Sequence, residues 1–232
     1  MSENQNSDCV LLEARNIGRK TLDDVWLLRE VSLKVQNADR WAITGPTGSG
    51  KTVFLRALCL LDEIDEGEIL WNGHLIDNQD VPLFRRQVIY LHQRPVLFEG
   101  TVEDNLRLPF SLLATDHPEK NREFDRTWIL KMLAELGRDA SFLRKKADDL
   151  SGGEAQITAL LRAVQLQPTL LMLDEPTAAL DAPSVTAIET LVDRWLTEPN
   201  QQRAFIWVSH DQKQIERIAN KTLRLHQGRI QE

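Results

Sequence analysis

The sequence contains few cysteines and no long apolar run. Two of its 232 residues are cysteines, Cys9 in a polar stretch and Cys59 among leucines. Such a pair does not indicate a disulfide framework, so we expect a reducing compartment and a core position for Cys59. The apolar run before Asp174 is far shorter than the roughly 18 to 20 residues that span a bilayer. We therefore expect a chain that does not itself cross a membrane.

The sequence also lacks an excess of positive charge. It holds 28 lysines and arginines against 35 aspartates and glutamates, a formal net charge of -7. Proteins that bind nucleic acids usually carry a basic surface, so this balance argues against DNA or RNA as a partner. The opening MSENQNSDC has no charged segment leading into an apolar one and does not resemble a secretory signal. We expect a cytoplasmic protein.

What the sequence does contain is an alternation of strand and helix signals. Its length predicts one large domain or a core with an inserted lobe, and no repeat or Gly/Ser linker divides it. Asp181 and Pro183 begin a helical pattern between two predicted strands, as an α/β fold with parallel strands requires. The expected strands are Val31–Val35, Trp41–Thr44, Glu68–Trp71, Val88–Leu91, Leu170–Leu173 and Phe205–Ser209.

The middle of the chain carries helical spacing only. We expect helices at Thr101–Ala114 and Pro118–Leu136. The second carries an apolar stripe, most simply core, of Phe124, Trp128, Met132 and Leu136. We therefore predict a helical lobe at residues 94–165, inserted into an α/β core made of residues 1–93 and 166–232.

The strongest local signal is GPTGSGKT. It follows the apolar run Trp41–Thr44 and precedes the helical pattern Val53–Leu61, which is the context of a P-loop. Glycines let backbone N–H groups surround phosphates, and the helix N-terminus favours negative charge. In such a loop Lys51 reaches the β- and γ-phosphates and Thr52 holds Mg²⁺. The predicted nucleotide-binding residues are Gly45, Pro46, Thr47, Gly48, Ser49, Gly50, Lys51 and Thr52.

An acidic pair follows a second apolar run. LLMLDE is a predicted strand that ends in Asp174 and Glu175. Beside a P-loop, Asp174 is suited to bind Mg²⁺ through water, and Glu175 is suited to polarise the attacking water. The alternative interpretation is a solvated acidic turn, which the presence of a P-loop in the same chain strongly disfavours.

The segment LSGGE predicts a helix start with two glycines. Ser151 and Glu154 have the spacing of a capping box, and a helix N-terminus also binds anions, so both roles can hold. A cap alone does not need Gly152 and Gly153, which weaken a helix and are useful where a ligand approaches the backbone.

From Leu12 to Ile230 these motifs resemble the ATP-binding cassette (ABC) ATPases. The shared motifs occur in the family's order: GPTGSGKT, LSGGE, LLMLDE, the ALD of Ala179–Asp181, and His210. The resemblance implies ATP as nucleotide and an α/β P-loop NTPase (RecA-like) core, with an N-terminal antiparallel β subdomain and an inserted helical lobe. It further implies a head-to-tail homodimer, in which each ATP lies between one subunit's P-loop and the other's signature. The signature residues are Ser151, Gly152 and Gly153.

The resemblance also assigns roles to single residues. Gln93 resembles the Q-loop glutamine, which contacts Mg²⁺ or water, and His210 resembles the switch histidine at the γ-phosphate. Asp181 resembles the D-loop aspartate at the dimer seam, and it could equally be a helix N-cap before Pro183. The catalytic residues so implied are Glu175, His210, Lys51 and Gln93. The implied metal ligands are Thr52, Gln93 and Asp174.

The sequence departs from the family pattern in three places. Arg19 stands where an aromatic residue usually stacks on adenine. A guanidinium can stack too, but a simply exposed arginine fits equally well, and Trp26 is another candidate. Ile157 replaces an arginine that often follows the signature, and Asp39-Arg40 replaces Gly-Glu before the P-loop strand. None of these changes removes a phosphate or Mg²⁺ ligand.

Within the family, the run FRRQVIYLHQRPVLFEGTVEDNL most resembles FetA/YbbL-type ATPases, which are associated with metal export. We expect an ATP-hydrolysing subunit that lies at the inner face of the cell membrane through separate permease subunits. A soluble mechanotransmitter or regulator is the alternative. A module that no longer hydrolyses ATP is disfavoured, because Lys51, Asp174, Glu175 and His210 are all present.

The residues that follow Gln93 are the candidate docking site for a permease. Leu97 and Phe98 are apolar residues in an expected loop, at a cleft predicted between core and lobe. We expect one of them to pack inward and the other to remain exposed for a short helix of the membrane subunit.

Overall fold

The structure is a computed structural model that describes residues 9–113, 123–178 and 180–231. Its contacts separate two units. The first consists of Met1–Tyr90, Pro168–Glu175 and Leu196–Glu232, and the second of Leu91–Gln167 and Pro176–Trp195. The predicted division into core and lobe stays a prediction, and these units are not identical with it, because Pro176–Trp195 groups with the predicted lobe.

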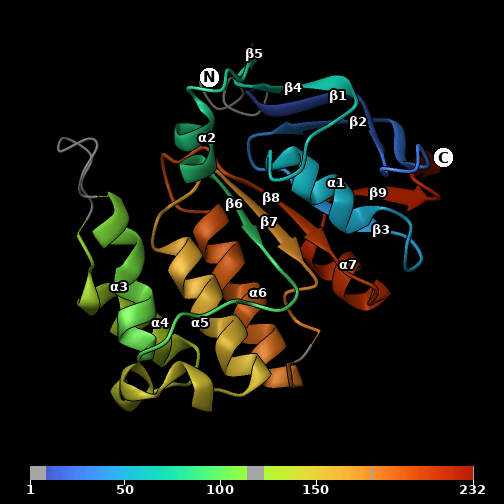
Figure 1. Cartoon of the computed structure of the whole chain (residues 1–232). Coiled ribbons are helices and arrows are strands. Elements are labelled where there is room, and N and C mark those ends of the chain that lie inside the picture. The colour runs from blue at the N-terminus through green and yellow to red at the C-terminus, as the bar shows by residue number, and fades with distance from the viewer. Residues whose placement is uncertain (1–8, 114–122, 179, 232) are drawn as a thin grey trace, which may run out of the picture. The chain divides into compact units, whose positions relative to one another are not determined.

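The first unit contains an antiparallel sheet and a six-stranded sheet (Figure 1). The antiparallel sheet has the order β2-β1-β4-β5, with bounds Trp26–Gln36, Val10–Lys20, Glu66–Trp71 and His74–Leu75. The second has the order β10-β9-β3-β8-β7-β6, with bounds Arg229–Gln231, Lys221–His226, Arg40–Thr44, Ala204–Val208, Leu170–Asp174 and Val88–Leu91. The unit's helices are α1 (Lys51–Leu58), α2 (Val81–Gln87) and α7 (Gln212–Ile218).

Every predicted strand is present within one or two residues or as part of a longer strand. Strand β1 was not among the predictions, because bulges interrupt its alternation: its pairing with β2 shifts repeatedly, and Asn16 has φ +50°. Strands β7 and β8 are buried along their whole length, which explains their unbroken apolar sequences. The two sheets and α1 share one core, in which Cys59 is buried as predicted, with its Sγ 3.2 Å from Sδ of Met172.

The second unit contains helices α3 (Val102–Leu113), α4 (Arg126–Glu135), α5 (Gly152–Val164) and α6 (Ala182–Leu196). The last residue of α6, Leu196, is assigned to the first unit. The predicted helix Pro118–Leu136 is wrong at its N-terminal side. Residues 118–122 lie outside the described residues, and α4 begins only at Arg126, because Asp125 caps it by accepting a hydrogen bond from the backbone of Trp128. Phe124 therefore precedes the helix, and its ring packs against Phe110 and under the guanidinium of Arg107.

The helix after the P-loop also differs from its prediction. Val53–Leu61 was expected, whereas α1 runs from Lys51 to Leu58. It ends earlier because Leu60 has a left-handed φ of +55°, a conformation that cannot continue a helix. Among the residues that the structure describes, no helix has the length and apolarity that crossing a membrane requires.

Candidate active site

The topology of the six-stranded sheet gathers the predicted phosphate, metal and water ligands at one edge. Strand β8 lies between β3 and β7 and is parallel to both. The carboxyl ends of all three strands therefore point the same way. The P-loop leaves β3 after Thr44, Asp174 ends β7, and His210 follows β8. In open α/β sheets this edge is where ligands bind.

The backbone of the P-loop requires glycine at two positions. Gly45 has φ +141°, and a Cβ there would lie 2.1 Å from the carbonyl oxygen of Leu225. Gly50 has φ +101°, and its Cβ would lie 3.0 Å from the carbonyl oxygen of Leu27. Side chains at either position would push the loop away from β9 or β2. The glycines therefore bring the loop close to the sheets while Pro46 and Thr47 remain exposed.

Polar groups in this loop lack protein partners. Ser49 is 3% exposed, and its Oγ has no hydrogen-bond partner among the residues that the structure describes. The N-cap of α1 is Gly50, so no side chain caps this helix, and its first turn contains no acidic residue. An oxyanion would satisfy both the buried hydroxyl and the first N–H groups of the helix. The loop thus fits a phosphate group.

Lys51 is the buried cation of the site. It is 7% exposed, and its Nζ donates hydrogen bonds to the carbonyl oxygens of Gly45 at 2.9 Å and Pro46 at 3.0 Å. Burial lowers the pKa of its ammonium group, while the negative charges of Glu175 and Asp174 act in the opposite direction. The lysine is therefore held on the P-loop, close to both acidic residues.

A shared carboxylate oxygen connects the P-loop to β7. Asp174, 4% exposed, accepts at Oδ2 a hydrogen bond from the Thr52 hydroxyl at 2.8 Å and another from the Tyr90 hydroxyl at 3.0 Å. A hydroxyl and a carboxylate are the hard oxygen donors that Mg²⁺ prefers, and Mg²⁺ usually takes its other ligands from water and phosphates. No group of three potential metal-ligating His, Cys, Asp or Glu side chains occurs in the described ranges. The residues present therefore fit Mg²⁺ held jointly with a nucleotide.

Glu175 and His210 form a second pair. His210 Nε2 lies 2.7 Å from Glu175 Oε1. Glu175 has a left-handed φ of +48°, and its backbone N–H donates to the carbonyl of Val208 at 3.1 Å. Such a conformation costs a non-glycine residue about 1 to 3 kcal/mol and recurs at functional sites. The turn directs Glu175 out of the strand, where His210 orients its carboxylate.

The signature segment lies in the second unit and begins α5. Ser151 accepts a hydrogen bond from the backbone N–H of Glu154, whose side chain accepts one from the backbone N–H of Ser151, each at 3.2 Å. The predicted capping box is therefore confirmed. Glu154 also contacts Lys145 at 2.7 Å, which lowers the pKa of the glutamate. Ser151 and Gly152 are exposed at this anchored helix start.

The remaining predicted site residues lie in both units. Gln93 and Asp181 belong to the second unit and are exposed. Asp181 accepts a hydrogen bond from the backbone N–H of Ser184 at 3.2 Å, so the predicted N-cap is present. That bond lowers the pKa of Asp181. Ala179 of the ALD motif lies outside the described residues.

The candidate adenine-stacking residues lie in the first unit. Arg19 donates a hydrogen bond from its guanidinium to the backbone carbonyl of Glu63. The Trp26 ring has the ammonium group of Lys20 4.5 Å from its centre. Stacking of either side chain on adenine stays a prediction.

Sequence reasoning missed Tyr90. It was seen only as part of an apolar strand, although it is the one residue of VIYL with a polar side-chain atom. That hydroxyl, in a strand at the edge of the same sheet, was the available signal. The structure places it in direct contact with Asp174.

Comparisons with known proteins agree with this geometry. Residues 28–178 match the family model described as "ABC transporter". The chain is 34% identical over 96% of its length, and 95% of the relative's, to the "Probable iron export ATP-binding protein FetA" of Escherichia coli. It is 32% identical over 91% of its length, and 55% of the relative's, to the "Spermidine/putrescine import ATP-binding protein PotA" of Thermotoga maritima. A solved dimeric structure of a bacterial ABC transporter cassette has a TM-score of 0.81 and 25% identity, covering 96% of this chain and 97% of that one.

Proposed function

Because this chain belongs to the ABC transporter family, in which it is an ATP-binding and ATP-hydrolysing subunit, we propose that it drives transport by separate membrane permease subunits. It would lie at the inner face of the cell membrane through those subunits. The observation that carries the proposal is the gathering of the P-loop, the acidic pair Asp174-Glu175, and His210 at one sheet edge.

The proposal gives each residue a role in hydrolysis, which the contacts between these residues support. The P-loop and Lys51 would bind the triphosphate, and Thr52 and Asp174 would hold Mg²⁺, which would neutralise charge on the phosphate oxygens. Glu175 accepts a proton from the attacking water, whose oxygen bonds to the γ-phosphorus while the bond to ADP breaks. His210 orients the Glu175 carboxylate through the 2.7 Å contact.

The proposed working form is a head-to-tail homodimer. The exposed start of α5, at Ser151 and Gly152, then supplies backbone N–H groups to ATP bound by the other subunit. Gln93 would contact Mg²⁺ or water, and Asp181 would lie at the dimer seam as well as capping α6. This arrangement explains why LSGGE contains glycines that a cap alone does not need.

The segment after Gln93 has the properties of a docking surface. Val96 is 72% exposed and Phe98 56% exposed, whereas Leu97 is partly buried, so one of the two predicted residues is indeed exposed. The backbone beneath them is held firmly. Asn105 accepts from the N–H of Phe98 at 2.8 Å and donates to its carbonyl at 2.9 Å, and Arg162 donates to the carbonyl of Val96 at 2.8 Å. Two apolar side chains are thus presented on an ordered backbone.

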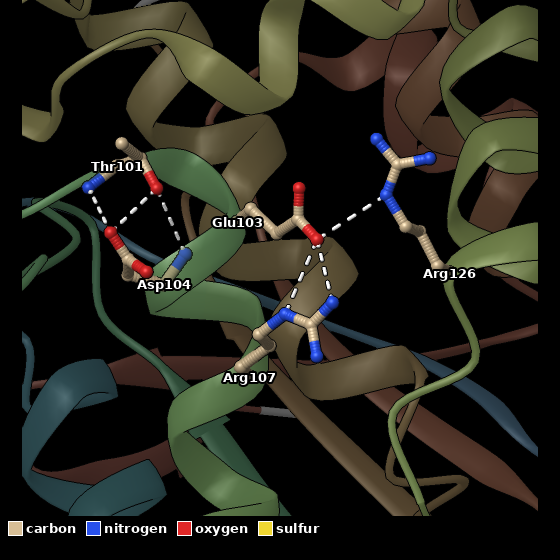
Figure 2. Close-up of polar contacts among 5 residues, drawn as sticks. All are labelled: Thr101, Glu103, Asp104, Arg107 and Arg126. Atoms are coloured by element: carbon tan, nitrogen blue, oxygen red, sulfur yellow. Dashed lines mark hydrogen bonds and ion pairs between the residues drawn. The ribbon is translucent and has the colours of Figure 1, made fainter.

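The helix that follows this segment is equally well anchored (Figure 2). Thr101 and Asp104 form reciprocal hydrogen bonds between side chain and backbone at the start of α3. In the same first turn, Glu103 Oε1 contacts Arg107, one turn further along α3, at 2.7 Å and Arg126 at 3.3 Å, which ties α3 to the start of α4. A force applied at Val96 and Phe98 would therefore be transmitted to α3 and α4 through this hydrogen-bonded backbone.

The test is copurification of a multi-span membrane protein with the tagged chain from detergent-solubilised cells. We expect Phe98→Glu to abolish copurification and to leave ATP binding by the isolated protein unchanged. Leu22→Glu is the matched control, because Leu22 is an exposed leucine in the turn between β1 and β2 of the first unit. Copurification that survives Phe98→Glu places the docking site elsewhere. A soluble partner in place of a permease would favour the mechanotransmitter alternative.

For the cargo, we propose a metal ion moved outward. The similarity to the FetA protein supports this, because it covers almost the whole of both chains. Cells that lack this chain should accumulate iron or another transition metal, and wild-type protein should restore the content where Glu175→Gln does not. If the metal content is unchanged and the uptake of polyamine or sulfate is altered instead, the proposal of metal export is wrong and import is favoured.

A further inference from the structure

The hydroxyl of Tyr90 occupies a position that the proposed reaction does not yet use. Tyr90 lies in β6 and is partly buried. Its O–H donates to Oδ2 of Asp174 at 3.0 Å, and the Thr52 hydroxyl donates to the same oxygen at 2.8 Å. Both bonds fall on Oδ2, so Oδ1 takes part in neither. One carboxylate oxygen is thus fixed from two sides.

The two donors differ in what else they are needed for. Thr52 follows Lys51 at the start of α1, where its hydroxyl is required for the metal and nucleotide. Tyr90 lies in β6, the strand beside β7, and its phenol hydroxyl contacts Asp174 at the end of β7. A tyrosine hydroxyl carries its proton at neutral pH, so this group can donate to the carboxylate.

We propose that Tyr90 is a positioning residue, whose hydroxyl holds the Asp174 carboxylate in a single orientation for Mg²⁺-dependent nucleotide binding. The inference rests on the proposed role of Asp174 at the metal. A carboxylate with one oxygen held by two hydroxyls cannot rotate freely, so little orientational freedom is lost when metal and nucleotide bind. Hydrogen bonds to metal-binding carboxylates typically contribute 10- to 100-fold to metal affinity or activity.

The position of Tyr90 in the chain adds a consequence. It lies three residues before Gln93, which the proposed function places at Mg²⁺ or water. The bond to Asp174 therefore anchors the end of the strand from which the Q-loop begins.

The test compares Tyr90→Phe, which removes only the hydroxyl, with wild type. Binding of a fluorescent ATP analogue is measured against Mg²⁺ concentration and again in EDTA. We expect the Mg²⁺ concentration for half-maximal binding to rise roughly tenfold, with affinity in EDTA unchanged. The matched control is Thr169→Val, which removes a hydroxyl bonded at 2.8 Å to Gln87 Oε1 just before β7 begins. It should leave the Mg²⁺ dependence as in wild type.

A spectroscopic measurement keeps the test valid if Tyr90→Phe folds poorly. Tyr90 is the only tyrosine in the sequence, so protein labelled with ¹³Cζ-tyrosine has a single tyrosine signal. Adding Mg²⁺ with ATP should shift that signal in wild type, and Asp174→Asn should remove the shift. A signal that does not respond contradicts the proposal.

The two proposals fail separately. If Asp174→Asn does not change the Mg²⁺ dependence of binding, the proposed metal site is wrong. If Asp174→Asn changes it and Tyr90→Phe does not, or if Tyr90→Phe weakens binding equally with and without Mg²⁺, the positioning role alone is wrong.

Discussion

The P-loop edge and the signature segment are both expected to bind ATP, but they are built in opposite ways. At the P-loop edge the functional side chains contact one another: Thr52 with Asp174, and Glu175 with His210. In the signature segment the side-chain bonds of Ser151 serve its own helix, through the capping box with Glu154. What Ser151 and Gly152 present outward is an exposed helix start.

The contrast indicates how each region is completed. A cluster of mutually bonded side chains within one unit is preorganised, and it should bind nucleotide in the isolated subunit. An exposed helix start has no catalytic side chains of its own. Its backbone N–H groups bind a phosphate only when another subunit brings one to it. We therefore expect changes at the P-loop edge to act within a subunit and changes at the signature to act across the dimer.

The largest effect should come from Glu175→Gln. The amide cannot accept the proton of the attacking water, so hydrolysis should slow by about 100- to 10,000-fold. Because closure precedes cleavage, ATP binding persists, and gel filtration with Mg-ATP should show an accumulated dimer. Glu216→Gln, an exposed change on α7, is the matched control. Turnover at the wild-type rate would exclude Glu175 as the base.

Ser151→Asp tests the signature segment directly. Aspartate is as good an N-cap as serine, so thermal stability should change little. The added negative charge should repel the triphosphate of the other subunit, and like charges in contact cost several kcal/mol. We expect hydrolysis to fall roughly 100-fold while ATP binding by the monomer persists. Loss of monomer binding would show that the two regions are not separable.

A mixing experiment sharpens this comparison. Ser151→Asp and Lys51→Ala chains, each expected to hydrolyse ATP only slowly alone, form mixed dimers with one intact P-loop facing one intact signature. Mixing should therefore restore measurable hydrolysis. If no mixture is active, ATP is not shared head-to-tail between subunits.

Lys51→Ala should weaken nucleotide binding within a single subunit. It removes a buried, charge-assisted hydrogen-bond donor, which contributes about 1.5 to 3 kcal/mol, or roughly 10- to 100-fold in the dissociation constant. Equilibrium titration of the monomer measures this. Lys213→Ala, an exposed lysine change on α7, should have no effect. Equal losses in both variants would mean that only net charge matters.

The smallest effect is expected at Arg19. Without an aromatic platform most binding energy comes from the triphosphate, so GTP should compete well with ATP. Arg19→Tyr should tighten ATP binding by at most about 1 to 2 kcal/mol, the size of a good stacking contact. Competition titrations give the result. A strong preference of wild type for ATP would point to Trp26 or another stacking residue.

Local sequence was sufficient for the features that depend on neighbours along the chain. The P-loop was evident from the spacing of its glycines, lysine and threonine, the capping box needed only Ser151 and Glu154, and the buried strands β7 and β8 were evident from unbroken apolar runs. Where bulges broke the alternation, as in β1, the same reasoning failed. It also failed at α4, whose start depends on the cap at Asp125.

Tertiary structure alone decided which distant side chains meet. Nothing along the chain relates Tyr90 to Asp174, which lies 84 positions away, and their bond exists because β6 and β7 are neighbours in the sheet. The Glu175 and His210 contact likewise depends on β7 lying beside β8. Motifs specify chemistry because residue type and short spacing are local properties. Strand order specifies geometry, because it is set by the packing of the whole sheet.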